Sequence, residues 1–144
     1  MKKLFISIVC SCMLVITCLA NTPNEKVLKA FESAFMQAEN VQWHDYTDYY
    51  EVSFRLPKLR ATIRYDKEGN QLGAKKYYDE TGLSSPVQES LKNKYPGKTV
   101  YGVTEISEAG KTVYYIKMQD DKTWITVKIT GKGQPRVYEK HRKA

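Results

Sequence analysis

Two segments of the chain alternate apolar and polar residues with a period of two, each on both sides of a short break. Such alternation is typical of an antiparallel hairpin that buries one face of a sheet. The breaks contain Pro57-Lys58 in the first segment and Asp120-Asp121-Lys122 in the second. An offset of 64 residues superimposes Tyr50, Val52, Phe54, Ile63 and Tyr65 on Tyr114, Ile116, Met118, Val127 and Ile129.

A helix-start signal precedes each hairpin. Thr22-Pro23-Asn24-Glu25 and Ser85-Pro86-Val87-Gln88 each combine a hydroxyl that can cap a helix, a proline and a side chain that can reach back to the cap. Apolar residues at a spacing of four then predict two amphipathic helices. These stripes are Val27, Phe31 and Phe35, with the helix ending at Glu39-Asn40, and Val87, Leu91 and Tyr95, with the helix ending before Pro96-Gly97.

Further strands are predicted around each hairpin. The first begins at Val41 and Trp43, and the others span residues 71–78, 99–107 and 134–141, while the second hairpin itself spans residues 111–119 and 122–130. The fold class is therefore α+β, with two tandem repeats of one helix followed by a four-stranded antiparallel sheet. We place the repeats at residues 21–81 and 82–144 and expect them to pack as one body. Whether their sheets form one continuous surface stays open.

Residues 1–20 have the features of a signal peptide. Lys2-Lys3 precede an apolar stretch, and Cys18-Leu19-Ala20 offers small residues for cleavage near Ala20. We expect an exported protein of the periplasm or the extracellular space, without a membrane-spanning helix. A lipid anchor at Cys18 is the alternative, although Thr17 fits a lipobox poorly.

Cleavage at this point changes the charge and the chemistry of the chain. It lowers the formal net charge from +7 to +5 and removes all three cysteines. Disulfides, cysteine-ligated zinc and cysteine nucleophiles are then excluded from the mature chain. Positive charge is concentrated from Lys128 to Lys143. It could attract acidic proteins, anionic lipid or polysaccharide, but a solvated terminus is the simpler interpretation.

Several short motifs, in this order, resemble a known family. They are the leader, Asn40-Val41-Gln42-Trp43, Tyr50-Glu51-Val52, the turn at residues 65–70, Lys94-Tyr95-Pro96-Gly97 and Tyr114-Tyr115-Ile116. The chain resembles the exported PepSY-like proteins of Bacteroides-type bacteria, which are similar to β-lactamase-inhibitor proteins (BLIP-like). The resemblance implies a helix-on-sheet repeat, an envelope or extracellular location and no established catalysis. It also implies binding or inhibition of another protein, by analogy of fold alone. The absence of cysteine from the mature chain departs from the disulfide-bonded inhibitors.

Large aromatic residues are predicted on the sheet face that the helices leave uncovered. By alternation this face carries Tyr49, Tyr115 and Trp124, and Tyr138 joins them from the last strand. Tyrosine and tryptophan often anchor protein interfaces, so these four are the candidate partner-binding residues. The competing interpretation is that they pack against one another and stabilise the sheet.

No catalytic residue, metal site or cofactor is predicted. His44 and His141 lack partner groups, and no serine or threonine lies at a strained turn beside a base. Asp66, Glu68 and Asn70 have the spacing of part of a calcium loop, but a hairpin turn explains them equally well.

The leading interpretation is a non-enzymatic exported module that binds a protein and could inhibit an envelope or secreted enzyme. The alternative is an envelope sensor for a small ligand or calcium, and a hydrolase comes third. Nucleic acid is not an expected partner, because the chain is exported and contains no recognition motif.

Overall fold

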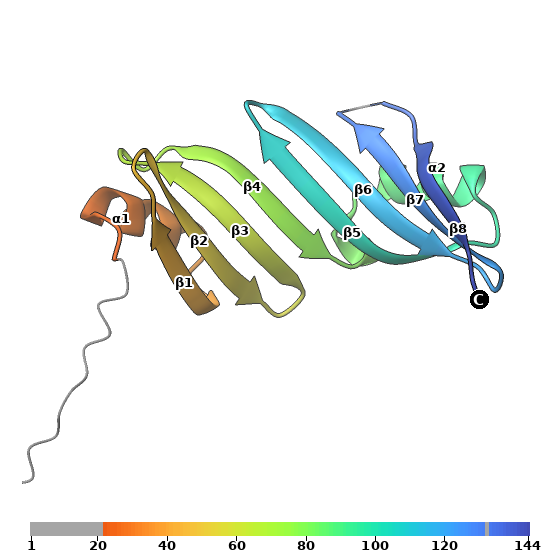
Figure 1. The fold of residues 1–144 in the computed structure, drawn as a ribbon, viewed down its shortest axis with the longest axis horizontal. Coiled ribbons are helices and arrows are strands. Elements are labelled where there is room, and N and C mark those ends of the chain that lie inside the picture. Colours follow the sequence, from red (N-terminus) through yellow and green to blue (C-terminus); the bar gives the residue numbers. More distant parts are fainter. Residues whose placement is uncertain (1–21, 132) are drawn as a thin grey trace, which may run out of the picture.

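The computed structural model describes residues 22–131 and 133–144; the predicted leader, Cys18 and Ala20 lie outside them (Figure 1). The first half consists of α1 (Glu25–Ala34), β1 (Glu39–Asp45), β2 (Tyr49–Leu56), β3 (Leu59–Asp66) and β4 (Gln71–Tyr78). The second consists of the 3-10 turn η1 (Glu80–Gly82), α2 (Ser85–Lys94), β5 (Thr99–Glu108), β6 (Lys111–Gln119), β7 (Thr123–Thr130) and β8 (Arg136–Arg142). The predicted strand bounds agree with these to within two residues.

The strands form one antiparallel sheet of eight, in the order β1 to β8 (Figure 1). Its halves are joined by the pairing of β4 with β5, which runs from Gly73 opposite Glu108 to Tyr78 opposite Val103. The fold is therefore α+β, with a single continuous sheet. The division into repeats at residues 81 and 82 stays a prediction.

Both helices pack on the same side of the sheet. Val27 and Phe31 of α1 are buried in a cluster that includes Ala74 of β4, and Leu91 of α2 is buried in a second cluster with Val103 of β5. Residues opposite each other on paired strands share a face, and the β4–β5 register puts Ala74 and Val103 on one face. The other face of the sheet is called the open face below; neither α1 nor α2, the α-helices of the described residues, packs on it. Within the described residues, neither helix is long and apolar enough to cross a membrane.

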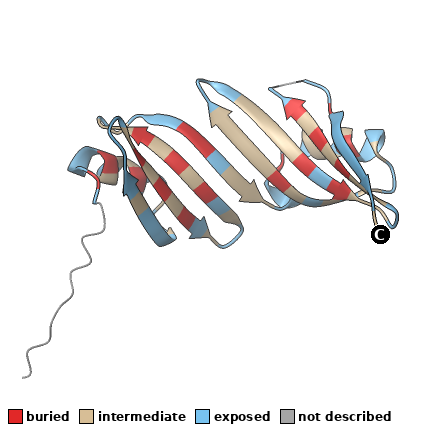
Figure 2. Cartoon of the chain, viewed as in Figure 1, coloured by how far each residue is buried: buried red, intermediate tan, exposed pale blue. Residues whose placement is uncertain are grey.

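The buried residues form two cores (Figure 2). Between them, polar side chains occupy the helix side of β4 and β5. The Tyr78 hydroxyl donates a hydrogen bond to Glu105 at 2.6 Å, and the Lys76 ammonium lies 3.3 Å from the same carboxylate. Burial, followed by the hydrogen bond to Glu105, raises the pKa of Tyr78. We call Lys76, Tyr78 and Glu105 the polar junction; it lies between the two cores.

The predicted helix ends were partly wrong. The N-cap of α1 is Asn24 rather than Thr22, and its side chain accepts a hydrogen bond from the Val27 amide at 3.1 Å. Asn24 also donates to the Lys67 carbonyl at 2.7 Å, so the tertiary contact with the β3–β4 turn selects this cap. The helix ends at Ala34, because Phe35 leaves the helical conformation to pack on the first core.

The second helix also begins differently from the prediction. Its N-cap is Ser84 rather than Ser85, and it makes no side-chain cap hydrogen bond. Gln88 donates instead to the carbonyls of Glu80 and Leu83, at 3.1 and 2.8 Å. The segment that contains η1 therefore holds the start of α2, and the reciprocal capping expected of Gln88 is absent.

We expect the two cores to unfold together, because the β4–β5 pairing links them. Ile63→Ala and Ile116→Ala each remove a fully buried side chain and should lower the free energy of unfolding by about 2–5 kcal/mol. Urea unfolding can be followed by fluorescence in the Trp124→Phe and Trp43→Phe backgrounds, in which the remaining tryptophan reports on one half. If the two cores unfold together, Ile63→Ala should lower the urea midpoint reported by Trp124 in the second half as much as the midpoint reported by Trp43 in the first half. Independent transitions would contradict it.

Replacement of Glu105 tests the polar junction. Its side chain is only 18% exposed, so Glu105→Ala leaves Tyr78 and Lys76 without their acceptor and should destabilise the fold by about 1–3 kcal/mol. The matched control is Glu108→Ala on the same strand, whose 62%-exposed carboxylate pairs with Arg64 and should contribute less than about 1 kcal/mol. Equal losses for the two variants in urea titrations would contradict the assignment.

Candidate functional site

Aromatic side chains gather on the open face of the second half. The rings of Tyr101 and Trp124 meet edge to face at 5.1 Å and 90°, and those of Tyr115 and Tyr138 at 5.4 Å and 76°. Tyr101 and Tyr138 nevertheless remain 64% and 63% exposed. Three of the four predicted residues thus lie on one surface, because the pairing of β6, β7 and β8 turns them away from the second core. We call Tyr101, Tyr115, Trp124 and Tyr138 the aromatic cluster.

Three lysines lie over the rings of this cluster. The Lys117 ammonium is 4.7 Å from the centroid of Trp124, and that of Lys143 is 4.8 Å from it. Lys128 lies between Tyr115 and Tyr138, at 5.4 and 5.7 Å from their centroids. Such cation–π contacts hold an ammonium group near the ring while part of its charge stays accessible. The cluster is therefore basic as well as aromatic.

Tyr49 is separate from the other three candidates. It begins β2, in the first half of the sheet, and its ring stacks on Tyr46 at 4.5 Å. The Arg64 guanidinium lies 5.9 Å from its centroid. The alternation of apolar and polar residues predicted that Tyr49 lies on the open face. It did not show that β2, which carries Tyr49, is four strands away from β6, which carries Tyr115.

Tyr101 belongs to the cluster but was absent from the sequence-based candidates. A register shift between Val100 and Gly102 interrupts the β5–β6 pairing. Because such a bulge breaks the period of two, alternation along the strand does not place Tyr101. The glycine directly after it is the local signal that could have suggested a bulge.

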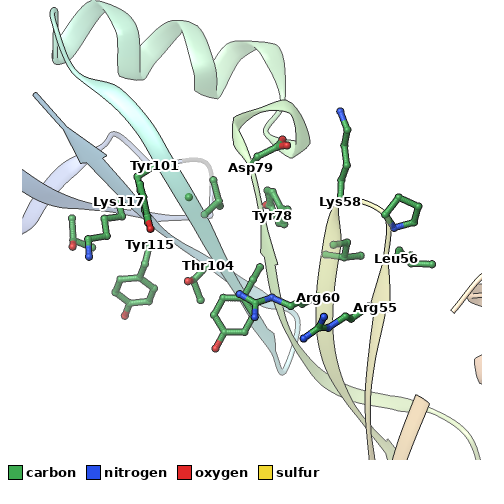
Figure 3. Close-up of a pocket in the computed structure, with 16 residues that line it drawn as sticks. Arg55, Leu56, Lys58, Arg60, Tyr78, Asp79, Tyr101, Thr104, Tyr115 and Lys117 are labelled. Atoms are coloured by element: carbon green, nitrogen blue, oxygen red, sulfur yellow. The ribbon is translucent and has the colours of Figure 1, made fainter. Parts of the chain in front are cut away.

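A hollow of about 670 Å³ adjoins the cluster on the open face (Figure 3). Arg55 and Arg60, from β2 and β3, lie on one side of it, and Tyr101, Tyr115 and Lys117 lie on the other. Gly102 also lines the hollow, and a Cβ atom added there would meet no atom within 4 Å. The hollow is thus flanked by cations, with Asp79 also in its lining, and it is open above Gly102.

The two histidines of the chain lie far apart in the described sheet. His44 lies on β1 and His141 on β8, the two opposite edges of the sheet. His141 lies 2.9 Å from Glu139. Among residues 22–131 and 133–144, no three or more His, Cys, Asp or Glu side chains are arranged to hold a metal ion.

Asp66 of the suggested calcium loop serves its own turn. Its carboxylate accepts hydrogen bonds from the Glu68 and Asn70 amides, at 2.9 and 2.8 Å, and from the Asn70 side chain at 2.9 Å. These bonds, above all those from Asn70, lower the pKa of Asp66. Weak binding of calcium or a small ligand stays a prediction.

The chain is similar to known proteins in structure but not in sequence. No protein-family model and no curated protein matches the sequence. A BLIP-like protein from Bacteroides fragilis has 14% identity and a TM-score of 0.55, with 84% of this chain and 86% of that chain covered. The chain has a BLIP-like fold.

Two further solved structures share it. A DUF2874 family protein from Bacteroides ovatus has 18% identity and a TM-score of 0.52, with coverage of 84% of this chain and 88% of that chain. A protein from Bacteroides eggerthii, provisionally described as periplasmic, has 14% identity and a TM-score of 0.51, with coverage of 84% and 89%. At these identities the likeness concerns the fold alone. The PepSY-like resemblance stays a prediction.

The β6–β7 turn yields a prediction on pH. The hydrogen bond from Lys98, followed by those from the Lys122 amide and Thr123, lowers the pKa of Asp120. A depressed carboxyl pKa stabilises the fold above the group's ordinary range, near pH 4, and this stabilisation is lost as the pH falls through the folded-state pKa. Asp120→Asn should therefore lower the Tm at pH 7, and its difference from the wild type should narrow progressively as the pH falls below about 4. The exposed neighbour Asp121, changed to Asn, is the control; an equal Tm for both variants at pH 7 would contradict the assignment.

Proposed function

We propose that the chain is an exported, non-enzymatic module that binds a protein partner through the aromatic cluster. The observation that carries this proposal is the incomplete burial of the cluster. Rings that served only to stabilise the sheet would be expected to bury most of their area against one another. Tyr101 and Tyr138 instead keep 64% and 63% of their surface exposed on a face without a helix.

The surroundings of the cluster also suit an interface. Tyrosine and tryptophan supply large contact areas at a low cost in side-chain entropy and are frequent among residues that dominate binding energy. Here they stand on paired strands rather than on loops, which keeps them in place before a partner arrives. The hollow beside them offers a recess for a protruding side chain or segment.

Inhibition of an envelope or secreted enzyme is the specific form of binding that we propose. Its support is the BLIP-like fold together with the leader features of the sequence. Fold similarity alone does not transfer a target, so the target must be identified by capture.

Capture from envelope and secreted extract tests the proposal. The chain from Asn21 onward contains both helices and all eight strands described above and is suitable bait. Tyr115→Ala combined with Trp124→Ala should reduce capture of a specific partner at least tenfold, because alanine replacement of an interface anchor costs about 2 kcal/mol or more. The matched control is Tyr46→Ala, which removes an exposed tyrosine of the first half. A partner retained in full by the double variant would overturn the aromatic cluster as the interface, and partner identification then allows direct inhibition assays.

A further inference from the structure

One row of side chains crosses the open face from β2 to β8. The pairing register places its seven members opposite one another on successive strands. They are Arg55, Arg60, Tyr77, Thr104, Tyr115, Lys128 and Arg136. We call this set the cation–tyrosine row. Four members are cations, although their sequence positions are far apart. The same register continues to Glu39, at the start of the edge strand β1, which lies opposite Arg55.

A second row on the same face has a different composition. It runs parallel to the first, four residues further along the strands, through Glu51, Arg64, Gly73, Glu108 and Lys111. Its charges balance, and the Arg64 guanidinium crosses above Gly73 to reach Glu108 at 2.7 Å. The open face is thus not uniformly basic. The second row is neutral, whereas the cation–tyrosine row carries unbalanced positive charge and has Lys75 and Lys117 beside it.

The cations of the cation–tyrosine row have no carboxylate partner. Other cations of the fold do, as in the ion pairs of Lys67 with Asp45 and Lys98 with Asp120. By contrast, none of the four row cations makes an ion pair with any residue in 22–131 or 133–144. Arg60 lies over the Tyr77 ring, at 5.8 Å from its centroid, and Lys128 lies over Tyr115 and Tyr138.

Like charges also lie directly opposite each other at both ends of the row. Arg55 pairs with Arg60, and Lys128 pairs with Arg136. Like-charge cross-strand pairs destabilise a sheet, and an oppositely charged ligand would relieve this cost. The cost is greater at the Lys128–Arg136 end, because Arg55 also faces Glu39 on β1. Local costs of this kind are typical of functional positions.

We propose that an extended acidic segment of the partner protein lies across the cation–tyrosine row, with one part seated in the hollow above Gly102. The proposal rests on the protein-binding function proposed above and specifies the chemistry of the partner. Neighbouring strands are about 4.8 Å apart, so seven strand positions span roughly 29 Å, the length of about nine extended residues. Carboxylates toward the two ends of such a segment would meet the two like-charge pairs. Its central side chains would contact Tyr77, Thr104 and Tyr115.

A protein segment fits this surface better than a uniformly charged polymer. The cations stand at the ends of the row, while its centre is tyrosine and threonine beside the aromatic cluster. This order favours a ligand with acidic ends and an aromatic or apolar centre. Anionic polysaccharide and anionic lipid are the alternatives that the experiment must separate.

The test starts with selection of peptides by the protein itself. A random library of 12-residue peptides displayed on phage is selected against the chain from Asn21 onward. Enriched peptides are then synthesised, and their affinities are measured by fluorescence anisotropy in about 0.15 M salt. We expect enrichment of peptides with acidic residues on both sides of an aromatic or apolar centre. Chondroitin sulfate and phosphatidylglycerol vesicles serve as the polysaccharide and lipid probes.

Two variants locate the binding of the selected peptides. Arg55→Glu should weaken it about tenfold, because attraction becomes repulsion at one end of the row. The same change creates a Glu–Arg pair with Arg60 but also places a glutamate opposite Glu39 on β1. Thermal unfolding of the variant is therefore measured beside its binding, and an unchanged Tm assigns the loss of binding to the row rather than to unfolding. Gly102→Trp places a ring in the hollow without a clash at Cβ and should also weaken binding about tenfold. Lys29→Glu, an equal change of charge on the exposed surface of α1, should stay within about twofold of the wild type.

Each contrary result overturns the proposal. Selected peptides without enrichment in acidic residues would overturn it. A loss of peptide affinity with Lys29→Glu equal to that with Arg55→Glu would also overturn it, because the effect would then reflect net charge alone. Binding of chondroitin sulfate or vesicles that depends on Arg55 and Gly102, with no acidic peptide selected, would assign the row to that ligand instead. A captured partner that depends on Tyr115 and Trp124 but tolerates Arg55→Glu would overturn the row and leave the proposed function standing. If peptide binding depends on the row but no captured partner depends on the aromatic cluster, the row stands as a peptide-binding surface and the proposed function is overturned.

Discussion

The hydrogen-bonded pairing of β4 with β5 is the constraint on which the rest of this structure depends. It joins two four-stranded segments, each with its own core, into one sheet of eight strands. Because residues on paired strands share a face, this pairing also places α1 and α2 on the same side. If the two segments had instead packed with their open faces together, the surface that carries the aromatic cluster would have been buried. The open face is a consequence of edge-to-edge pairing.

The junction achieves this continuity without a continuous apolar core. Between the two clusters of buried residues, the helix side of the sheet is occupied by Lys76, Tyr78 and Glu105, whose polar groups satisfy one another. The Glu105 carboxylate accepts hydrogen bonds from the Tyr78 hydroxyl and the Lys76 ammonium, and these directional contacts give the junction a defined geometry. The open side is then free to carry side chains selected for something other than packing.

Those side chains differ between the two rows that have been compared. One row balances its charges internally, through the contact of Arg64 with Glu108. The other collects four cations, with Glu39 in register only at the β1 edge, and opposes like charges at Arg55–Arg60 and Lys128–Arg136. A shared BLIP-like fold accounts for neither pattern, since 14–18% identity leaves the surface chemistry of each protein its own. We therefore expect the specificity of the proposed binding to reside in the composition of these rows.

The sequence alone determined the local elements, because a period of two or of four reflects which side of an element is buried. It located the strands to within two residues and turned Tyr115 and Trp124 away from the core, as alternation requires. It did not locate the cap of α1, since Asn24 is held by a contact with a turn more than forty residues away. It also missed Tyr101, because a bulge changes the face of the residues beyond it.

Only the tertiary structure decided which outward residues lie together. Tyr49 and Tyr115 share a face but lie in different halves of the sheet, whereas Arg55 and Arg136, far apart in sequence, belong to one row. Register across seven strands depends on every hairpin and bulge between them, and a shift of one residue in any pairing would exchange the faces. The sequence thus determined which face each side chain takes, and the summed registers determined its neighbours.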